Sequence, residues 1–238
     1  MGFIRMEITK GLASDIRQQS LAVLQRLQQT YGSPGWGVSM SPVDELVSTI
    51  LSQNTNDANR DRAYKNLQKR FPTWEEVRDA PPVRVIETIR TAGLANKKGP
   101  RIQEVLRAIT AERGSLNLGF LLDWPVDQAY DWLTQFKGVG PKTASIVLLF
   151  SFGKPVFPVD THIYRVTGRL GLRPPIMSVE QTHQHLANLF PIESYRTAHL
   201  NLIRLGREVC HPHKPECPTC PINDLCEYYS IQNEEQTL

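Results

Sequence analysis

The sequence predicts an all-α protein, and three observations support this fold class. Apolar residues recur at helical spacing through most of the chain, as Val43, Leu46 and Ile50 do at positions i, i+3 and i+7. Residues that cap helices precede several of these segments, and glycine follows several of them. Only residues 156–159 resemble a strand, and prolines flank or interrupt this short run.

The predicted helices follow one another with short connections. Ser41, Pro42 and Asp44 illustrate the start signal: a serine that caps, a proline at the first helical position and an acid three residues after the cap. A similar spacing recurs at residues 73–76 and 178–181. The predicted helices lie at residues 14–32, 41–51, 85–93, 102–114, 129–133, 144–152, 163–170, 178–190 and 198–209, and a further one begins at residue 73.

Composition narrows the class of protein further. The chain has 238 residues, of which 40% are hydrophobic and 21% charged, so neither a disordered nor a fibrous protein is expected. No run approaches about 20 apolar residues, and the N-terminal segment shows no secretory signal. The net charge of +3 is compatible with nucleic-acid binding. We therefore expect a soluble, intracellular protein with no membrane partner.

A glycine hairpin, Gly138-Val139-Gly140, stands between two predicted helices. Two glycines let the backbone turn tightly and present N–H groups to an anion, and the positive end of the next helix points the same way. With the neighbouring Lys137, this hairpin can hold a DNA phosphate without reading any base. An ordinary helical hairpin, in which the glycines only turn the chain, is the alternative.

Two charged residues near the hairpin are candidates for chemistry. Lys142 lies in the first turn of a predicted helix, where the macrodipole disfavours a cation, so we expect a lowered pKa and a better amine nucleophile. A lysine that contacts phosphate as a point charge is the alternative. Asp160 precedes a helical pattern, and its ordinary role is an N-cap; a carboxylate held there can also accept a proton or stabilise a cationic transition state. His162 is interpreted as structural.

The four cysteines all fall in one short segment, at Cys210, Cys217, Cys220 and Cys226. A disulfide framework would spread cysteines along the chain, whereas four thiolates from one loop can bind Zn²⁺ or a [4Fe–4S] cluster. Zinc sites usually pair two Cys-x2-Cys hooks, and only one is present, so the spacing favours the cluster. Lys214 lies in the same loop, in a rigid basic segment that can contact phosphate.

Taken together, these motifs resemble the endonuclease III family of DNA glycosylases. The shared pattern is a glycine hairpin, a lysine, an aspartate and then Cys-x6-Cys-x2-Cys-x5-Cys, and the resemblance runs from about residue 41 to residue 228. It implies a two-domain, all-α helix-hairpin-helix DNA glycosylase fold. Residues 36–154 would form a six-helix barrel domain with the hairpin. Residues 1–35 and 155–238 would form a second domain with the cluster loop at 210–226.

The same resemblance implies roles for single residues. Lys142 matches the nucleophile of the family, Asp160 its catalytic aspartate, and the four cysteines the ligands of a [4Fe–4S] cluster. Gly138 and Gly140 match the hairpin glycines that bind phosphate. Leu94 falls where the family places a wedge that enters the base stack. A buried leucine at a helix end is the alternative for this position.

The chain departs from the family pattern at three places. Phe136 and Lys137 replace a Leu-Pro pair before the hairpin, and Pro141 replaces the usual basic residue before the nucleophile. Proline suits a first helical position, and Lys137 can replace the lost charge. Asn54 stands where the family has a gap-filling glutamine, with Gln53 one residue earlier. This segment borders the lesion pocket in the family, so we expect both residues to contact DNA.

The reaction implied by the resemblance is base excision followed by strand cleavage through a lysine Schiff base and β-elimination. We therefore expect a bifunctional DNA glycosylase and AP lyase of base excision repair that removes an oxidised pyrimidine. Its partner would be double-stranded DNA with damaged bases or abasic sites. We expect a monomer, in the cytoplasm and associated with the nucleoid. The alternatives are a glycosylase for uracil or thymine opposite guanine, and a non-catalytic DNA-binding iron–sulfur or zinc protein.

Overall fold

The structure, a computed structural model, describes the backbone of residues 2–34 and 40–235, and these residues form α-helices, short 3-10 helices and loops without any strand. The predicted all-α class is confirmed. Residues 156–159 lie in a loop and form no strand pairing within the part of the chain that is described. No helix among the described residues is both long enough and apolar enough to cross a bilayer.

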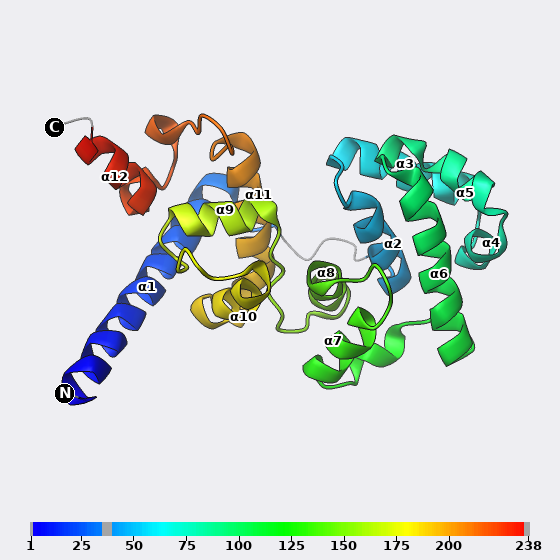
Figure 1. Cartoon of the computed structure of the whole chain (residues 1–238), viewed down its shortest axis with the longest axis horizontal. Helices are drawn as coiled ribbons and strands as arrows, with labels where there is room; N and C mark the ends of the chain where they lie inside the picture. The colour runs from blue at the N-terminus through cyan, green and yellow to red at the C-terminus, as the bar shows by residue number, and fades with distance from the viewer. Residues whose placement is uncertain (1, 35–39, 236–238) are drawn as a thin grey trace. The chain divides into compact units, whose positions relative to one another are not determined.

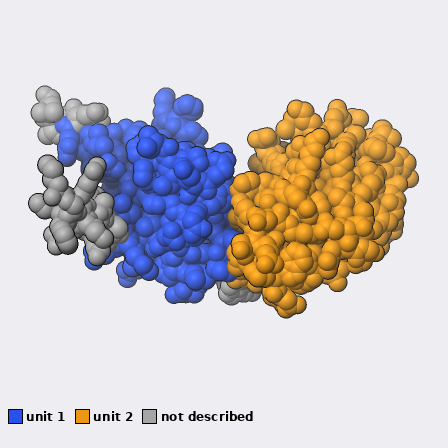
Figure 2. Space-filling model, turned by 60° about the horizontal axis from the view of Figure 1, so that its bottom comes forward, with its two compact units in different colours: residues 1–37, 155–238 blue, residues 38–154 orange. Residues whose placement is uncertain are grey.

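The chain divides into two compact units, which Figure 2 shows in different colours. One unit is the continuous segment 38–154. The other joins residues 1–37 to residues 155–238, so its two parts are far apart in the sequence. Each unit has its own apolar core, and each is described by itself below.

The continuous unit contains seven α-helices among its described residues. They are α2 (Pro42–Ser52), α3 (Asp57–Arg70), α4 (Trp74–Asp79), α5 (Pro82–Thr88), α6 (Ala95–Arg113), α7 (Val126–Thr134) and α8 (Pro141–Phe152), with the 3-10 helices η1 (Arg90–Ala92) and η2 (Gly119–Leu122). Helices α2 and α8 pack against each other, as Figure 1 shows, and bury Leu46, Ile50 and Val147 completely or nearly so. Burial of each such side chain contributes about 1.5–3 kcal/mol. This packing fixes the start of α8 relative to α2.

The second unit is built around α1 (Gly2–Tyr31) and α11 (Tyr195–Glu208), which pack against each other. Leu27 of α1 and Leu202 of α11 are almost fully buried. Gln19 of α1 donates to the carbonyls of Leu170 and Leu225, at 2.7 and 2.9 Å, and so joins α1 to the C-terminal part of the chain. The other elements are α9 (Thr161–Arg169), α10 (Val179–Leu189), α12 (Glu227–Glu235) and the 3-10 helices η3 (Ile192–Ser194), η4 (Cys217–Thr219) and η5 (Asn223–Leu225).

Four helices differ most from the prediction, and one of them, α12, was not predicted at all because the end of the chain was expected to be a frayed tail. Helix α3 was not predicted, because it buries only Ala63, Tyr64 and Leu67 and therefore shows a weak apolar pattern, although Asn56 caps it. Helix α1 begins at Gly2 rather than residue 14, since no proline interrupts the preceding residues. Helix α6 begins at Ala95 rather than residue 102. Helices α1 and α6 are longer than the apolar stripe that the prediction had followed.

Candidate functional site

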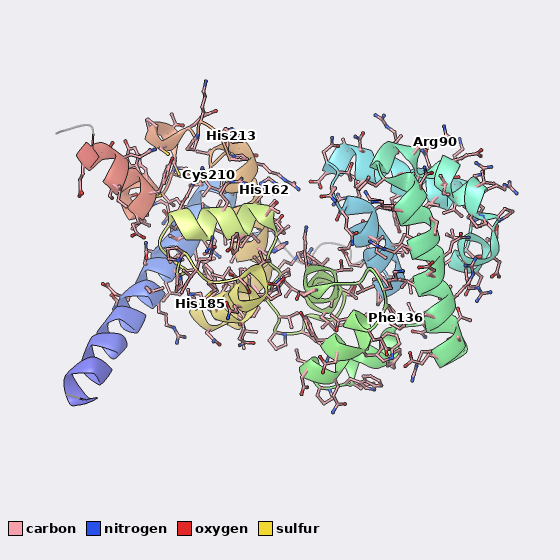
Figure 3. The ribbon with its side chains drawn as sticks, viewed as in Figure 1. Arg90, Phe136, His162, His185, Cys210 and His213 are labelled. Atoms are coloured by element: carbon pink, nitrogen blue, oxygen red, sulfur yellow. The ribbon has the colours of Figure 1, made fainter. Side chains whose placement is uncertain are left out.

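The hairpin between α7 and α8 is a tight turn that requires glycine at one position. Gly138 has φ +94°, and a Cβ there would clash with Cδ of Arg101. Val139 donates its N–H to the carbonyl of Phe136, and Figure 3 labels Phe136. Val139 is only 2% exposed. Within the described residues, the N–H groups of Gly138 and Gly140 have no acceptor. These two amides, rather than Val139, are the ones that can bind an anion.

Lys142 is the second residue of α8 and is half-buried. The first turn of α8 contains no acidic residue, and Gly140 caps the helix without a side-chain hydrogen bond. The positive end of the helix dipole therefore coincides with a lysine. Lys137, before the hairpin, is exposed. Two cations thus flank the hairpin amides, an arrangement suited to a polyanion.

Gln53 and Asn54, which follow α2, differ in what their side chains can reach. Gln53 donates its Nε2 to the carbonyl of Gly138 at 3.3 Å, so its amide is bound to the hairpin. Asn54 is exposed and has φ +51°, a left-handed conformation that asparagine tolerates. The side chain of Asn54 is therefore accessible to a ligand, whereas that of Gln53 is hydrogen-bonded to the glycine hairpin.

Leu94 lies between η1 and α6 and is 51% exposed, so the alternative of a buried leucine at a helix end is wrong. It has φ +49°, and Gly93 before it has φ +67°. A pocket of about 430 Å³ adjoins this leucine, and Figure 3 labels Arg90, one of its lining residues. The residues that line it are Arg90, Leu94, Ala95, Asn96 and Lys97. An exposed apolar side chain therefore stands beside exposed cations.

Lys98 lies in the first turn of α6, directly after residues 94–97, and is only 2% exposed. Its Nζ donates to the carbonyls of Leu51 and Ala92, both at 2.7 Å. Burial lowers the pKa of Lys98 to about 8. The basic run Lys97-Lys98 predicts two lysines that neutralise phosphate, but for Lys98 this prediction is wrong, because its Nζ is buried and bound to protein carbonyls. Lys98 is four residues before Ile102 and therefore continues the apolar face of α6.

Asp160 is the N-cap of α9, as predicted: its Oδ1 accepts the N–H of Ile163 at 2.8 Å, and the residue is 8% exposed. Two histidines hold the segment before it. His183 donates Nδ1–H to the carbonyl of Phe157 and His199 to that of Pro158, each at 3.0 Å. The carboxylate is therefore fixed by its helix and by the chain that precedes it.

His162, labelled in Figure 3, is the second residue of α9 and is half-buried. Its Nδ1 lies 3.2 Å from Nη2 of Arg165. Burial lowers the pKa of His162, while the charge of Asp160 opposes this effect and that of Arg165 adds to it. The neutral form is therefore favoured.

The four cysteines lie between the end of α11 and the start of α12, and all are half-buried. Two arginines of α9 contact this loop. Arg169 donates to Sγ of Cys210 at 3.2 Å and to the carbonyl of His211 at 2.6 Å, and Arg165 donates to the carbonyl of Cys210 at 3.0 Å. Cys210 and His213 are labelled in the same loop in Figure 3. Helix α9 therefore joins the aspartate at its start to the cysteine loop.

The thiols are close enough to influence one another. Burial raises the pKa of Cys220 to about 11, and the charges of the other three cysteines add to this. Burial also raises the pKa values of Cys217 and Cys226. A bound metal would favour the thiolates instead. Among the described residues, no group of three or more cysteine, histidine, aspartate or glutamate side chains is placed to hold a metal ion.

Lys214 is exposed in this loop, with φ +51°. Of the predicted DNA contacts, Lys137, Asn54 and Leu94 are also accessible, and all three belong to the continuous unit. Lys142 belongs to that unit as well, while Asp160 belongs to the other.

Comparisons with known proteins agree with these motifs. Residues 47–191 match the family described as "HhH-GPD superfamily base excision DNA repair protein". Endonuclease III of Thermotoga maritima is 34% identical over 191 residues, covering 79% of this chain and 84% of that protein. Endonuclease III of Escherichia coli K12 is 32% identical over 213 residues, covering 89% and 96%. A putative DNA glycosylase of Arabidopsis thaliana is 40% identical over 153 residues, which are 64% of this chain and 52% of that protein.

Solved structures give the same result. A structure of a trapped endonuclease III–DNA covalent intermediate superposes with a TM-score of 0.77 at 28% identity, covering 91% of this chain and 98% of the other. A non-covalent endonuclease III–DNA complex gives a TM-score of 0.77 at 29% identity, covering 92% and 98%. The chain therefore belongs to the HhH-GPD superfamily of base excision DNA repair proteins, within its endonuclease III family.

Proposed function

We propose that this protein removes an oxidised pyrimidine from duplex DNA and cleaves the strand, with Lys142 as the nucleophile and Asp160 as the assisting carboxylate. The DNA glycosylase and AP lyase activities follow from its family. The observation that carries the residue assignment is the lysine in the first turn of α8, directly after the hairpin and with no acid in that turn. The dipole of α8 by itself disfavours a cation in this turn.

In the proposed reaction the neutral amine of Lys142 attacks C1′ of a flipped nucleotide. The C–N bond to the protein forms, and the glycosidic bond breaks, with its electron pair leaving on the base, which is protonated. Opening of the sugar ring gives the Schiff base. Loss of a proton from C2′ then expels the 3′ phosphate by β-elimination and cuts the strand on the 3′ side of the lesion.

Asp160 is proposed to accept a proton from the lysine and to balance the positive charge that develops on the sugar. Its fixed position supports this role, because preorganised charge needs no rearrangement during the reaction. The N-cap hydrogen bond to Ile163 uses one carboxylate oxygen, so capping and catalysis are compatible.

The chain binds DNA, in keeping with its likeness to endonuclease III–DNA complexes. We assign phosphate contacts to the amides of Gly138 and Gly140 and to Lys137 and Lys214, and entry into the base stack to Leu94. Damaged duplex as the preferred ligand and a monomer as the acting form are parts of the same proposal.

Cys210, Cys217, Cys220 and Cys226 are proposed to hold a [4Fe–4S] cluster, which would organise this loop and leave its sulfurs as thiolates. Replacement of Cys217 by serine should lower the iron content and the yellow-brown absorbance of the purified protein. A variant with undiminished iron and colour would remove Cys217 from the set of ligands.

The proposed function is tested with a panel of duplexes, each carrying one lesion. The panel contains an oxidised pyrimidine, uracil or thymine opposite guanine, and an abasic site, and base release and strand cleavage are scored separately. Release and cleavage at the oxidised pyrimidine, with covalent trapping by borohydride, are expected. Preferred release at the mismatches would identify a mismatch glycosylase, and cleavage at abasic sites alone would limit the protein to lyase activity.

A further inference from the structure

The wedge turn, defined here as residues 92–95 and including Leu94, accepts a hydrogen bond from a buried lysine. Lys98 comes from α6, and one of its two acceptors is the carbonyl of Ala92, at the start of this turn. The other is the carbonyl of Leu51, near the end of α2 and 47 residues away in the sequence. Two segments that are not neighbours in the chain are therefore joined through one amine.

The connection continues from α2 to the hairpin. Gln53, two residues after Leu51, donates its Nε2 to the carbonyl of Gly138. One series of side-chain hydrogen bonds thus runs from the wedge turn through the end of α2 to the hairpin, all within the continuous unit. The segments at its two ends are the two proposed contacts with the DNA of the lesion.

The conformation of the wedge turn needs such support. Leu94 has φ +49°, a left-handed conformation that is unfavourable for a leucine, and half of its surface is exposed to water. A residue persists in this region only where its surroundings determine its backbone. Lys98 satisfies the carbonyl two residues before Leu94 and fixes the depth of the turn against α2.

We propose that Lys98 and Gln53 are positioning residues that fix the wedge turn relative to the hairpin. Leu94 then enters the base stack close to the phosphates that the hairpin binds. This inference rests on the proposed function. It also gives Gln53 a role different from direct DNA contact. Neither residue touches the reacting atoms; each acts through the segment to which it donates.

The chain supplies matched controls. Lys154 is a second buried lysine of the same unit, and its Nζ donates to the carbonyls of Leu122 and Trp124, at 3.0 and 2.6 Å; neither carbonyl belongs to the wedge turn or the hairpin. Gln103 is buried and donates its Nε2 to the carbonyls of Val77 and Ala80. Replacing Lys154 or Gln103 removes a buried side-chain donor of the same type but leaves the hydrogen bonds of Lys98 and Gln53 in place.

The experiment compares Lys98→Met and Gln53→Met with Lys154→Met and Gln103→Met in the full chain. Three quantities are measured: affinity for intact duplex, affinity for a duplex with a tetrahydrofuran abasic analogue, and fluorescence of 2-aminopurine beside the analogue. Unfolding in urea is followed in parallel. Lys98→Met should lower the ratio of affinities for the analogue duplex and the intact duplex by about tenfold. It should also reduce the rise in 2-aminopurine fluorescence on binding, because a displaced Leu94 unstacks the adjacent base poorly.

Affinity for intact duplex should be unchanged in Lys98→Met, since phosphate contacts set it. Lys154→Met and Gln103→Met should lose stability but keep the preference. Gln53→Met should act in the same direction as Lys98→Met, and the double variant should lose no more than the larger single loss, as expected for one shared series. If Lys98→Met fails to fold, the pair Gln53→Met and Gln103→Met decides the question.

A preference that stays at the wild-type value in Lys98→Met and Gln53→Met, or that falls equally in the controls, would overturn the positioning role. A wild-type protein without lesion preference or trapping on any duplex would instead contradict the proposed function itself.

Discussion

Helices α8 and α9 begin with opposite charges at the same kind of place. Helix α9 is capped by Asp160, whose carboxylate accepts a backbone N–H and meets the positive end of the helix dipole. Helix α8 is capped by Gly140 without a side-chain hydrogen bond, and its second residue is Lys142. The dipole stabilises the first charge and opposes the second, each by about 0.3–1 kcal/mol.

This contrast separates two kinds of evidence for function. Asp160 would be favoured at its position by stability alone, so its location says little about catalysis. Lys142 is placed against the dipole of its own helix, which disfavours a cation in the first turn. The lysine is therefore the more informative residue. The aspartate gains its proposed role from the hydrogen bonds that fix it and from the family resemblance.

The largest effect is expected at the start of α8. Lys142→Gln keeps a side chain of similar length but lacks the amine, so borohydride trapping and strand cleavage should be abolished while binding to damaged duplex persists. Urea unfolding is measured in parallel to show that the variant is folded. Lys137→Gln is the control and should still be trapped. Persistent trapping of Lys142→Gln would assign the nucleophile to another amine.

At the start of α9, Asp160→Asn and Asp160→Ala separate catalysis from capping. Both variants should slow base release by orders of magnitude, a loss of several kcal/mol in transition-state stabilisation. Asparagine still caps a helix, so only Asp160→Ala should also lose about 1 kcal/mol of stability. Single-turnover base release and urea unfolding measure the two effects. Equal stability of the two variants would show that the cap contributes nothing to folding.

The turn before α8 should tolerate alanine at only one of its glycines. Gly138→Ala combines a positive φ with a Cβ placed against Arg101, and it should cost about 1–3 kcal/mol of stability and weaken binding to every duplex alike. Gly140→Ala is the matched control, because its φ is −93° and no atom lies within 4 Å of an added Cβ. Thermal unfolding and duplex affinity are the measurements. Equal effects of the two substitutions would contradict this account of the hairpin.

The smallest effect concerns pH and the first turn of α9. Because the pKa of His162 is lowered in the folded state, the unfolded chain binds its proton first as the pH falls through about 6.5. The free energy of unfolding should therefore fall in that range, and His162→Gln should lose this part of the pH dependence. Urea unfolding of both proteins between pH 7.5 and 5 measures it. Identical slopes would exclude His162 as a source of the acid sensitivity.

Local sequence was sufficient for the features that depend on neighbours along the chain. The caps at Ser41, Thr73, Asp160 and Ser178 were predicted from residues three positions apart, and each accepts the expected backbone N–H. Cap geometry involves a single turn, so a short pattern contains all of its determinants. The glycine hairpin depends on contiguous residues, and the family resemblance combines several such short motifs in chain order; the family was confirmed.

Only the tertiary structure decided the contacts made between distant segments. Lys98 lies on the apolar face of α6, yet its acceptors come from Ala92 and from Leu51, and no local pattern indicates that these carbonyls converge on one amine. Gln53 was expected to contact DNA but donates to Gly138, 85 residues away in the sequence. A buried polar group needs partners wherever the fold brings them, and packing, not spacing along the chain, determines which backbone groups those are.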